Sequence, residues 1–300
     1  MTSSTNLARS ERPTLLTGVQ QIADAYDGFI LDLWGVVHDG DKPLPGVIDC
    51  LTKLRDHNKH IVILSNAPRR AEDVKERLDG IGIPRALYHE VMTSGEETWQ
   101  HLKDRRDPWY ANLGRRIYHM GPPRDRGMLT GLDLDETTDI EKAEAILNTG
   151  SYMDGDALAT YEPALVIAAK RRLPMVCANP DLEVIHRGKR QICAGAIAKR
   201  YEELAGEVRW HGKPYPSVYQ TCFGLFGKIA KNRIIAVGDS LRTDIAGANG
   251  AGISSLFVTG GIHAAMLDIE EGTAPAVDAL AKHYDEWRQA PTAAIAGFQW

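Results

Sequence analysis

The sequence has few cysteines, no excess of positive charge and no long apolar run, and each of these deficits narrows the class of protein. Its cysteines are scattered through mostly apolar segments without metal-ligand spacing, at Cys50, Cys177, Cys193 and Cys222. This pattern disfavours a disulfide framework or a zinc site made by these cysteines, and it favours buried free thiols. The 35 basic and 40 acidic residues give a net charge of -5, so the overall charge offers no attraction to nucleic acid or to an anionic membrane.

No stretch of about 18 consecutive apolar residues is present, and the polar residues 1–5 lack the basic-then-apolar layout of a signal peptide. We therefore expect a soluble, cytoplasmic protein that acts on small molecules and binds neither nucleic acid nor membrane. A homo-oligomer is compatible with these features, which leave the oligomeric state open. At 300 residues with 43% hydrophobic content, the chain can build one large domain or two moderate ones.

Apolar strands and amphipathic helices alternate at both ends of the chain, which predicts an α/β fold with a parallel sheet. The segments of this pattern are an apolar run at 28–37, an amphipathic stretch at 47–57, an apolar strand at 60–64, a helical segment at 68–78, and later strands at 234–237 and 255–258 joined by a helix that begins near Thr243. We expect a doubly wound, Rossmann-like core. Residues 289–300 are expected to be loosely held.

The regular alternation is lost from about residue 88 to about residue 187. This stretch carries its own candidate strands at 116–120 and 175–178 and its own helix at 163–172. An insertion that divides the core is the simplest account. The expected organisation is therefore a first core segment at 1–87, an inserted α/β domain at 88–187, and a second core segment at 188–300.

Acidic residues follow two of the predicted core strands. Asp32 stands in the apolar run 28–37, where a side chain at the carboxyl end of a parallel strand faces the ligand-binding crevice of such sheets. Asp239 and Asp244 follow the strand at 234–237. Carboxylates that meet without a cation between them would repel, so the two acidic strand ends suggest a divalent metal.

Four short segments at predicted strand ends carry the polar residues, and they lie at 32–36, 65–66, 212–214 and 238–244. Their order and residue types resemble the four motifs of the haloacid dehalogenase superfamily of phosphohydrolases. With 93–95, 179–181 and 194–197, they are similar to the class IIA branch, which includes NagD-like nucleotide phosphatases, p-nitrophenyl phosphatases and pyridoxal phosphate phosphatases. The resemblance spans roughly residues 27 to 262, most of the chain.

The resemblance implies a Mg²⁺-dependent phosphatase that hydrolyses a small-molecule phosphate monoester through an aspartyl-phosphate. Asp32 would be the nucleophile, Lys213 a catalytic and phosphate-binding cation, and Ser65 and Asn66 further phosphate ligands. The expected metal ligands are Asp32, the backbone carbonyl of Trp34, Asp239 and Asp244. The inserted domain would be a cap that selects the leaving group, with pyridoxal or pyridoxine phosphate, nucleotides and sugar phosphates all open.

Several of these residues also have ordinary structural interpretations. Ser65 could cap the helix that follows it, Lys213 could be an exposed loop lysine, and Asp244 could offset a helix dipole. The order of the motifs favours the functional interpretation in each case.

Trp34 departs from the family pattern, which has a second aspartate at this position as general acid. General acid catalysis is worth about 10²–10⁴ in rate, so an activated or aromatic leaving group is favoured. His38, Asp39 and a metal-bound water are the candidate substitutes. Two alternatives stay open: a metal-independent, haloacid dehalogenase-type hydrolase, and a catalytically impaired fold that acts as a binding or regulatory protein. The acids Asp239 and Asp244 favour the phosphatase.

Overall fold

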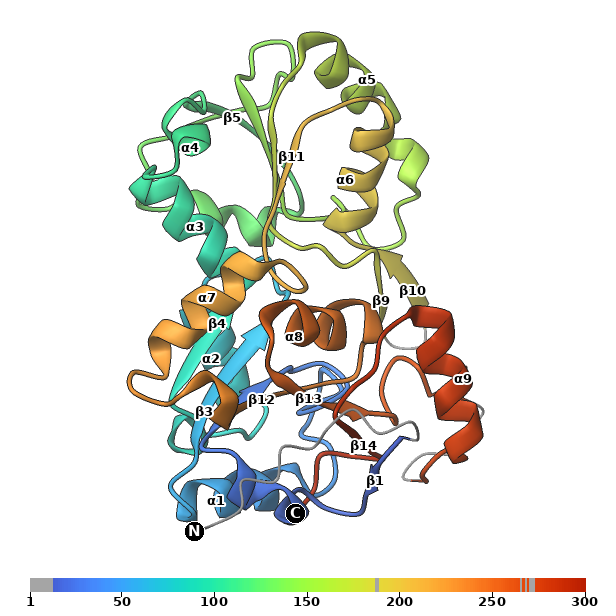
Figure 1. Ribbon diagram of the computed structural model, residues 1–300. Coiled ribbons are helices and arrows are strands. Elements are labelled where there is room, and N and C mark those ends of the chain that lie inside the picture. The colour runs from blue at the N-terminus through green and yellow to red at the C-terminus, as the bar shows by residue number, and fades with distance from the viewer. Residues whose placement is uncertain (1–12, 187–188, 265, 268, 270–272) are drawn as a thin grey trace. The chain divides into compact units, whose positions relative to one another are not determined.

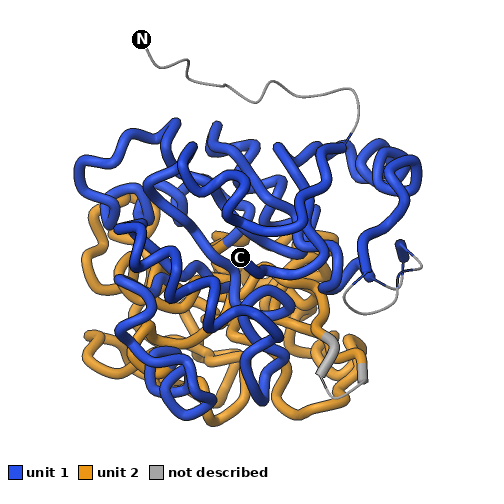
Figure 2. Tube along the Cα trace, turned by 90° about the horizontal axis from the view of Figure 1, so that it is seen from below, with its two compact units in different colours: residues 1–65, 74–92, 213–300 blue, residues 66–73, 93–212 orange. Residues whose placement is uncertain are grey.

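The computed structural model describes residues 13–186, 189–264, 266–267, 269 and 273–300, and its elements are labelled in Figure 1. The chain forms two compact units, which Figure 2 shows in different colours. Unit 1 comprises Met1–Ser65, Val74–Met92 and Lys213–Trp300, and unit 2 comprises Asn66–Asp73 and Thr93–Gly212. In the described part of the chain, no helix is long and apolar enough to cross a membrane.

Unit 1 is built on a seven-stranded sheet in the order β1-β14-β13-β12-β2-β3-β4. The strands are β1 (Leu15–Leu16), β14 (Ala293–Ile295), β13 (Ser254–Val258), β12 (Ile234–Gly238), β2 (Gly28–Leu31), β3 (His60–Ser65) and β4 (Glu90–Thr93). Every pairing from β1 through to β3 is parallel. The central strands β2 and β12 are buried along their whole length, which explains why their sequences are continuously apolar rather than alternating.

Helices of unit 1 bury one apolar face each. In α1 (Val47–Asp56) the buried residues Val47, Cys50, Leu51 and Leu54 recur at helical spacing. The other helices are α2 (Ala71–Gly80), α7 (Pro216–Leu225), α8 (Ala246–Ala251) and α9 (Val277–Trp287), and the short turns are η1 (Val19–Gln21), η2 (Ala23–Ala25), η3 (Arg85–Leu87), η6 (Lys231–Arg233) and the π-helical η7 (Leu241–Ile245). The first residues of α2 belong to unit 2.

Unit 2 has its own five-stranded parallel sheet in the order β11-β8-β7-β5-β6. Its strands are β5 (Arg116–Met120), β6 (Asp135–Thr137), β7 (Ala145–Asn148), β8 (Met175–Cys177) and β11 (Val208–Trp210), beside an antiparallel hairpin of β9 (Glu183–His186) and β10 (Lys189–Ile192). The helical elements are α3 (Ser94–Asp104), α4 (Pro108–Ala111), η4 (Pro123–Leu129), η5 (Leu158–Thr160), α5 (Glu162–Arg171) and α6 (Ala194–Glu203). One apolar cluster involves α5 and α6, and another involves α3 and α4.

The structure confirms the expected α/β class with a parallel core sheet and a second α/β unit. The division of the chain differs from the expected 88–187, because α6 and β11 complete the sheet and core of unit 2, which therefore runs to Gly212. The first apolar run forms a strand only to Leu31. Beyond it the carbonyl of Leu33 accepts hydrogen bonds from the amides of Val37 and His38, which makes a turn.

The expectation of a loosely held C-terminus was wrong. Strand β14 lies between β1 and β13 in the core sheet, Phe298 is buried, and the amide of Val19 donates to the carbonyl of Gln299. The segment Ala293–Ile295 has only three residues with mostly small side chains, so its strand is specified by pairing with distant strands rather than by a local pattern. All four cysteines are buried thiols outside any disulfide.

Candidate active site

Three aspartates gather at one edge of the sheet of unit 1. Asp32 follows β2 and Asp239 follows β12, and these strands are parallel neighbours with Leu31 opposite Val237. Asp244 lies on η7, directly beyond Asp239. Carboxylate oxygens of the three residues lie within 4.8 Å of one another, and the residues are only 9%, 5% and 3% exposed. This is the edge at which open parallel sheets bind their ligands.

Lys213 provides the positive charge within this group. Its Nζ donates to Asp32 Oδ1 at 2.5 Å and to Asp244 Oδ1 at 2.7 Å. Burial disfavours the charged ammonium, but Asp244 and Asp32 outweigh this effect and raise the pKa of Lys213 above its usual value. Lys213 is therefore a fixed cation and not an exposed loop lysine.

The three carboxylates carry more negative charge than Lys213 can balance. Burial, with Asp32 and Asp244 nearby, raises the pKa of Asp239 well above its usual range. Burial also raises the pKa of Asp244 to about 6, with Asp32 acting in the same direction and Lys213 against it. A divalent cation would remove this repulsion, and an all-oxygen set of few carboxylates is the type of site that Mg²⁺ uses.

The backbone around Asp239 is packed closely against its carboxylate. A Cβ on Gly35 or on Gly261 would collide with the side chain of Asp239, and Gly35 also has a φ of +79°. The amide of Ile262 donates to Asp239 Oδ2 at 2.7 Å. These contacts hold the carboxylate in one position, so the residues present fit a bound divalent metal.

Asp244 is held by both of its oxygens. Its Oδ1 accepts from Lys213 and its Oδ2 accepts from the amide of Ser240 at 3.1 Å. The Ser240 hydroxyl accepts from the amide of Thr243 at 3.3 Å and caps the π-helical turn. The turn therefore aims Asp244 at Lys213, so its role extends beyond offsetting a helix dipole.

The side chains considered as substitutes for the missing general acid are poor proton donors. His38 is buried, its Nδ1 accepts from the amide of Gly40 at 2.9 Å, and burial lowers its pKa to about 4, so it is neutral at neutral pH. Hydrogen bonds from the amides of Asp41 and Lys42 lower the pKa of Asp39 below its usual value. Trp34 itself is 37% exposed and contacts the His38 ring edge to face.

The two expected phosphate ligands are in different situations. Ser65 ends β3, the parallel neighbour of β2, and is half-buried in unit 1. Asn66 belongs to unit 2, where its Nδ2 donates to Asp181 Oδ1 at 2.9 Å. The structure thus brings Asp32, Lys213, Asp239 and Asp244 together and leaves the amide of Asn66 engaged in unit 2.

The sequence interpretation missed the backbone that supports Asp239. Gly35, Gly261 and the amide of Ile262 all contact this carboxylate. The one available signal was the Gly260–Gly261 pair shortly after the apolar strand β13, which is typical of a close backbone approach to a site.

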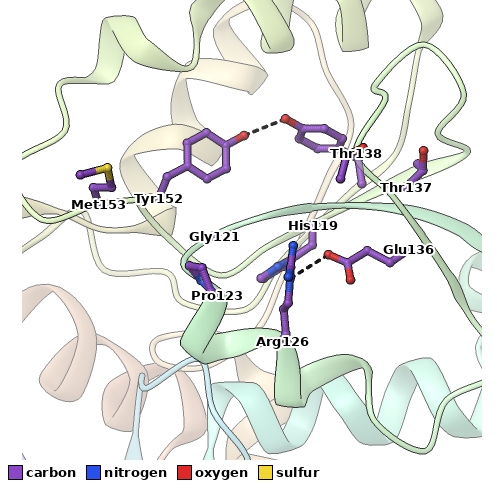
Figure 3. Close-up of a pocket in the computed structure, with 10 residues that line it drawn as sticks. His119, Gly121, Pro123, Arg126, Glu136, Thr137, Thr138, Tyr152 and Met153 are labelled. Atoms are coloured by element: carbon purple, nitrogen blue, oxygen red, sulfur yellow. Dashed lines mark hydrogen bonds and ion pairs between the residues drawn. The ribbon is translucent and has the colours of Figure 1, made fainter.

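Unit 2 contains a pocket of about 340 Å³ beside strands β5 and β6 (Figure 3). Arg126 and Glu136 form an ion pair of 3.1 Å in its wall, and the hydroxyls of Tyr118 and Tyr152 are 3.0 Å apart. His119 also lines the pocket, with its Nε2 bonded to Thr149 Oγ1 at 2.8 Å. The wall therefore combines aromatic rings with hydrogen-bonding and charged groups.

Two family models match the sequence: haloacid dehalogenase-like hydrolase over residues 29–135 and HAD-hydrolase-like over residues 210–286. They contain Asp32, Ser65 and Asn66 in the first range and Lys213, Asp239 and Asp244 in the second. The chain belongs to the haloacid dehalogenase-like hydrolases.

Known relatives of this haloacid dehalogenase-like hydrolase are similar along most of its length. D-glycerol 3-phosphate phosphatase of Mycobacterium tuberculosis is 26% identical over 247 residues, which are 82% of this chain and 67% of that protein. Ribonucleotide monophosphatase NagD of Escherichia coli is 25% identical over 243 residues, 78% of this chain and 87% of that protein. The crystal structure of a haloacid dehalogenase-like hydrolase from Brucella suis is 29% identical, has a TM-score of 0.80, and covers 94% of this chain and 99% of its own. These likenesses agree with the class IIA branch that the motifs indicated.

Proposed function

We propose that this haloacid dehalogenase-like phosphoric monoester hydrolase is a Mg²⁺-dependent phosphatase of a small-molecule phosphate monoester, with Asp32 as nucleophile. The observation that carries the proposal is the buried group of Asp32, Asp239, Asp244 and Lys213 at one edge of the sheet. The names of the relatives, a glycerol 3-phosphate phosphatase and a ribonucleotide monophosphatase, support the substrate class.

The reaction follows from the chemistry of the carboxylate. Asp32 attacks phosphorus, the ester P–O bond breaks, and the leaving group departs with the bonding electron pair. Water then attacks the aspartyl-phosphate, inorganic phosphate is released, and the Asp32 carboxylate is restored. Lys213 reduces the repulsion between Asp32 and the incoming anion, and Asp244 keeps Lys213 in place.

Asp32, Asp239, Asp244 and the backbone carbonyl of Trp34 are the residues that would hold Mg²⁺. The bound ion supplies positive charge that offsets the charge on the phosphate oxygens. Ser65 would add a hydroxyl donor for the phosphate from the neighbouring strand end.

The leaving group must depart without help from His38 or Asp39 at neutral pH. An activated leaving group, such as the phenolate of an aryl phosphate, tolerates this best. We propose that unit 2 selects the leaving group; the tyrosines and the Arg126–Glu136 pair of its pocket suit an aromatic or hydroxylated group.

The test is a panel of phosphate esters and 2-haloacids offered to the purified protein with Mg²⁺ or with chelator. Phosphate release that requires Mg²⁺ is expected. Halide release at full rate in chelator would replace the phosphatase with the dehalogenase alternative. The absence of both activities, together with tight binding to a protein partner, would favour the regulatory alternative.

A further inference from the structure

Unit 2 contains a second group of ionisable side chains, distinct from the aspartates of unit 1. Glu97 and His101 are one helical turn apart on α3 and so share a face, His211 follows β11, and Tyr110 lies on α4. Ligand atoms of Glu97, His101 and His211 lie within 4.8 Å of one another. Glu97, His211 and Tyr110 are 0%, 3% and 2% exposed, so this group is a core feature.

Neighbouring groups fix the orientation of both Glu97 and His211. The amide of Gly212 donates to Glu97 Oε2 at 2.9 Å, and His211 Nε2 forms a hydrogen bond with the Tyr110 hydroxyl. His211 Nδ1 therefore faces the carboxylate, 3.3 Å from Glu97 Oε2. It is out of line for a hydrogen bond there, and it has no other hydrogen-bond partner among the described residues.

One ring nitrogen of this group is left without a hydrogen bond, because His211 Nδ1 has no partner among the described residues. His101 adds a further ring nitrogen to the same space. If Nε2 of His211 donates to Tyr110, a lone pair on Nδ1 points toward the buried Glu97 carboxylate, and a cation between them removes the conflict.

We propose that Glu97, His101 and His211 bind a Zn²⁺ ion. Two imidazoles and one carboxylate are a common zinc donor set, with the fourth position left for water, whereas imidazole nitrogens are poor ligands for Mg²⁺. Tyr110 is then a positioning residue that holds His211 with Nδ1 toward the metal. This site is separate from the proposed phosphatase chemistry and does not depend on it.

The chain positions of the ligands suggest what the metal does. Helix α3 begins directly after β4, where the chain re-enters unit 2 at Thr93, and His211 lies two residues before Lys213, where the chain returns to unit 1. A metal bound to both would tie together the two ends of the segment Thr93–Gly212 and stabilise it. Gly212, whose amide donates to Glu97, lies between the last ligand and Lys213.

The test uses the untagged full-length protein purified without chelator, with metal content measured by mass spectrometry and cobalt substitution followed by visible absorption. We expect about one equivalent of zinc per chain and the absorption bands of tetrahedral Co²⁺. His101→Gln and His211→Gln should lose most of this metal, whereas the matched control His119→Gln, on β5 of the same unit, should retain it.

His101 is only half-buried, so His101→Gln should stay folded, and far-ultraviolet circular dichroism checks this. Wild-type protein that binds neither zinc nor Co²⁺ would overturn the proposal, as would full zinc in both folded His variants. Because metal content is measured without any phosphate ester, either result leaves the phosphatase proposal standing.

Discussion

Two aspartates stand at opposite ends of β2 in opposite situations. Asp27 precedes the strand, is half-buried, and pairs with Arg233 at 2.8 Å. Asp32 follows the strand and is buried against Lys213. The same residue type is thus a surface ion-pair partner at the amino end and a candidate nucleophile at the carboxyl end, where the ligand edge lies.

Substitution of Asp32 should affect turnover, whereas substitution of Asp27 should affect only stability. Asp32→Asn should reduce turnover of any phosphate ester by at least about 10³-fold, because an amide cannot form the acyl-phosphate. Asp27→Asn should leave turnover unchanged and lower the free energy of unfolding by no more than about 1 kcal/mol. Steady-state kinetics and urea unfolding of both variants check this. An Asp32→Asn protein with wild-type rate would remove Asp32 as nucleophile.

Trp34 at the position of the general acid predicts that the rate depends on the leaving group. Without a proton donor, the rate of phosphoryl transfer should fall steeply as the pKa of the leaving alcohol rises, so activated aryl phosphates should react well and alkyl phosphates poorly. The measurement is a leaving-group series under single-turnover conditions with the wild-type protein. A flat series with fast transfer would show that another proton donor exists. Trp34→Asp should flatten the dependence.

Glycines in the loops around Asp239 let neighbouring strands and loops pack closely against its carboxylate. Gly261→Ala should place a methyl group against the Asp239 carboxylate and shift β12 or the loop after β13, with an activity loss of at least tenfold. Gly224→Ala is the matched control. Gly224 lies in α7, where an added Cβ would meet none of the described atoms within 4 Å. Gly224→Ala should therefore keep full activity and raise the free energy of unfolding by about 0.5–1 kcal/mol. Kinetics and thermal unfolding distinguish the two; equal activity in both variants would contradict the packing argument.

Local patterns predicted the elements whose buried residues recur at regular spacing or in a continuous run. Strands β5 and β12 and helices α1 and α5 were located to within about one residue, because apolar runs and helical spacing report burial directly. The candidate site was also visible, since acids after buried parallel strands must meet at one edge. Whether those residues perform the proposed chemistry stays a prediction.

Other features depend on partners that are distant in sequence. Strand β14 is specified by pairing with β1 and β13, and the end of unit 2 by the addition of β11 to β8. The proximity of His211 to Glu97 has the same origin. The i, i+4 pair Glu97 and His101 on α3 is visible in the sequence, but the third residue, His211, follows the distant strand β11. No local pattern reports such contacts.

The proposed roles of the two units predict that substitutions in unit 2 change substrate preference, whereas phosphoryl transfer depends on unit 1. Arg126→Ala, which removes one half of the ion pair in the pocket of unit 2, should change the ranking of substrates by about tenfold or more. Hydrolysis of p-nitrophenyl phosphate should change little, because charge neutralisation resides in unit 1. The control is Arg115→Ala, an exposed arginine of unit 2 that pairs with Asp133. The measurement is kcat/KM across the ester panel. An unchanged substrate ranking in Arg126→Ala would show that this pocket does not determine substrate specificity.

The charge balance of unit 1 should also govern the stability of the folded chain. Mg²⁺ at about 100 times its dissociation constant should add about 2.7 kcal/mol to the free energy of unfolding, because the ion binds the assembled carboxylates and not the unfolded chain. Asp239→Asn should lose this gain. It should nevertheless be at least as stable as the wild type without metal, because the amide removes a buried carboxylate that its neighbours oppose. Asp27→Asn should keep the full magnesium effect.

Thermal unfolding of the three proteins, with and without Mg²⁺ after chelator treatment, measures each quantity. A magnesium-dependent rise in Tm that persisted in Asp239→Asn would show that Mg²⁺ binds at a site other than these aspartates.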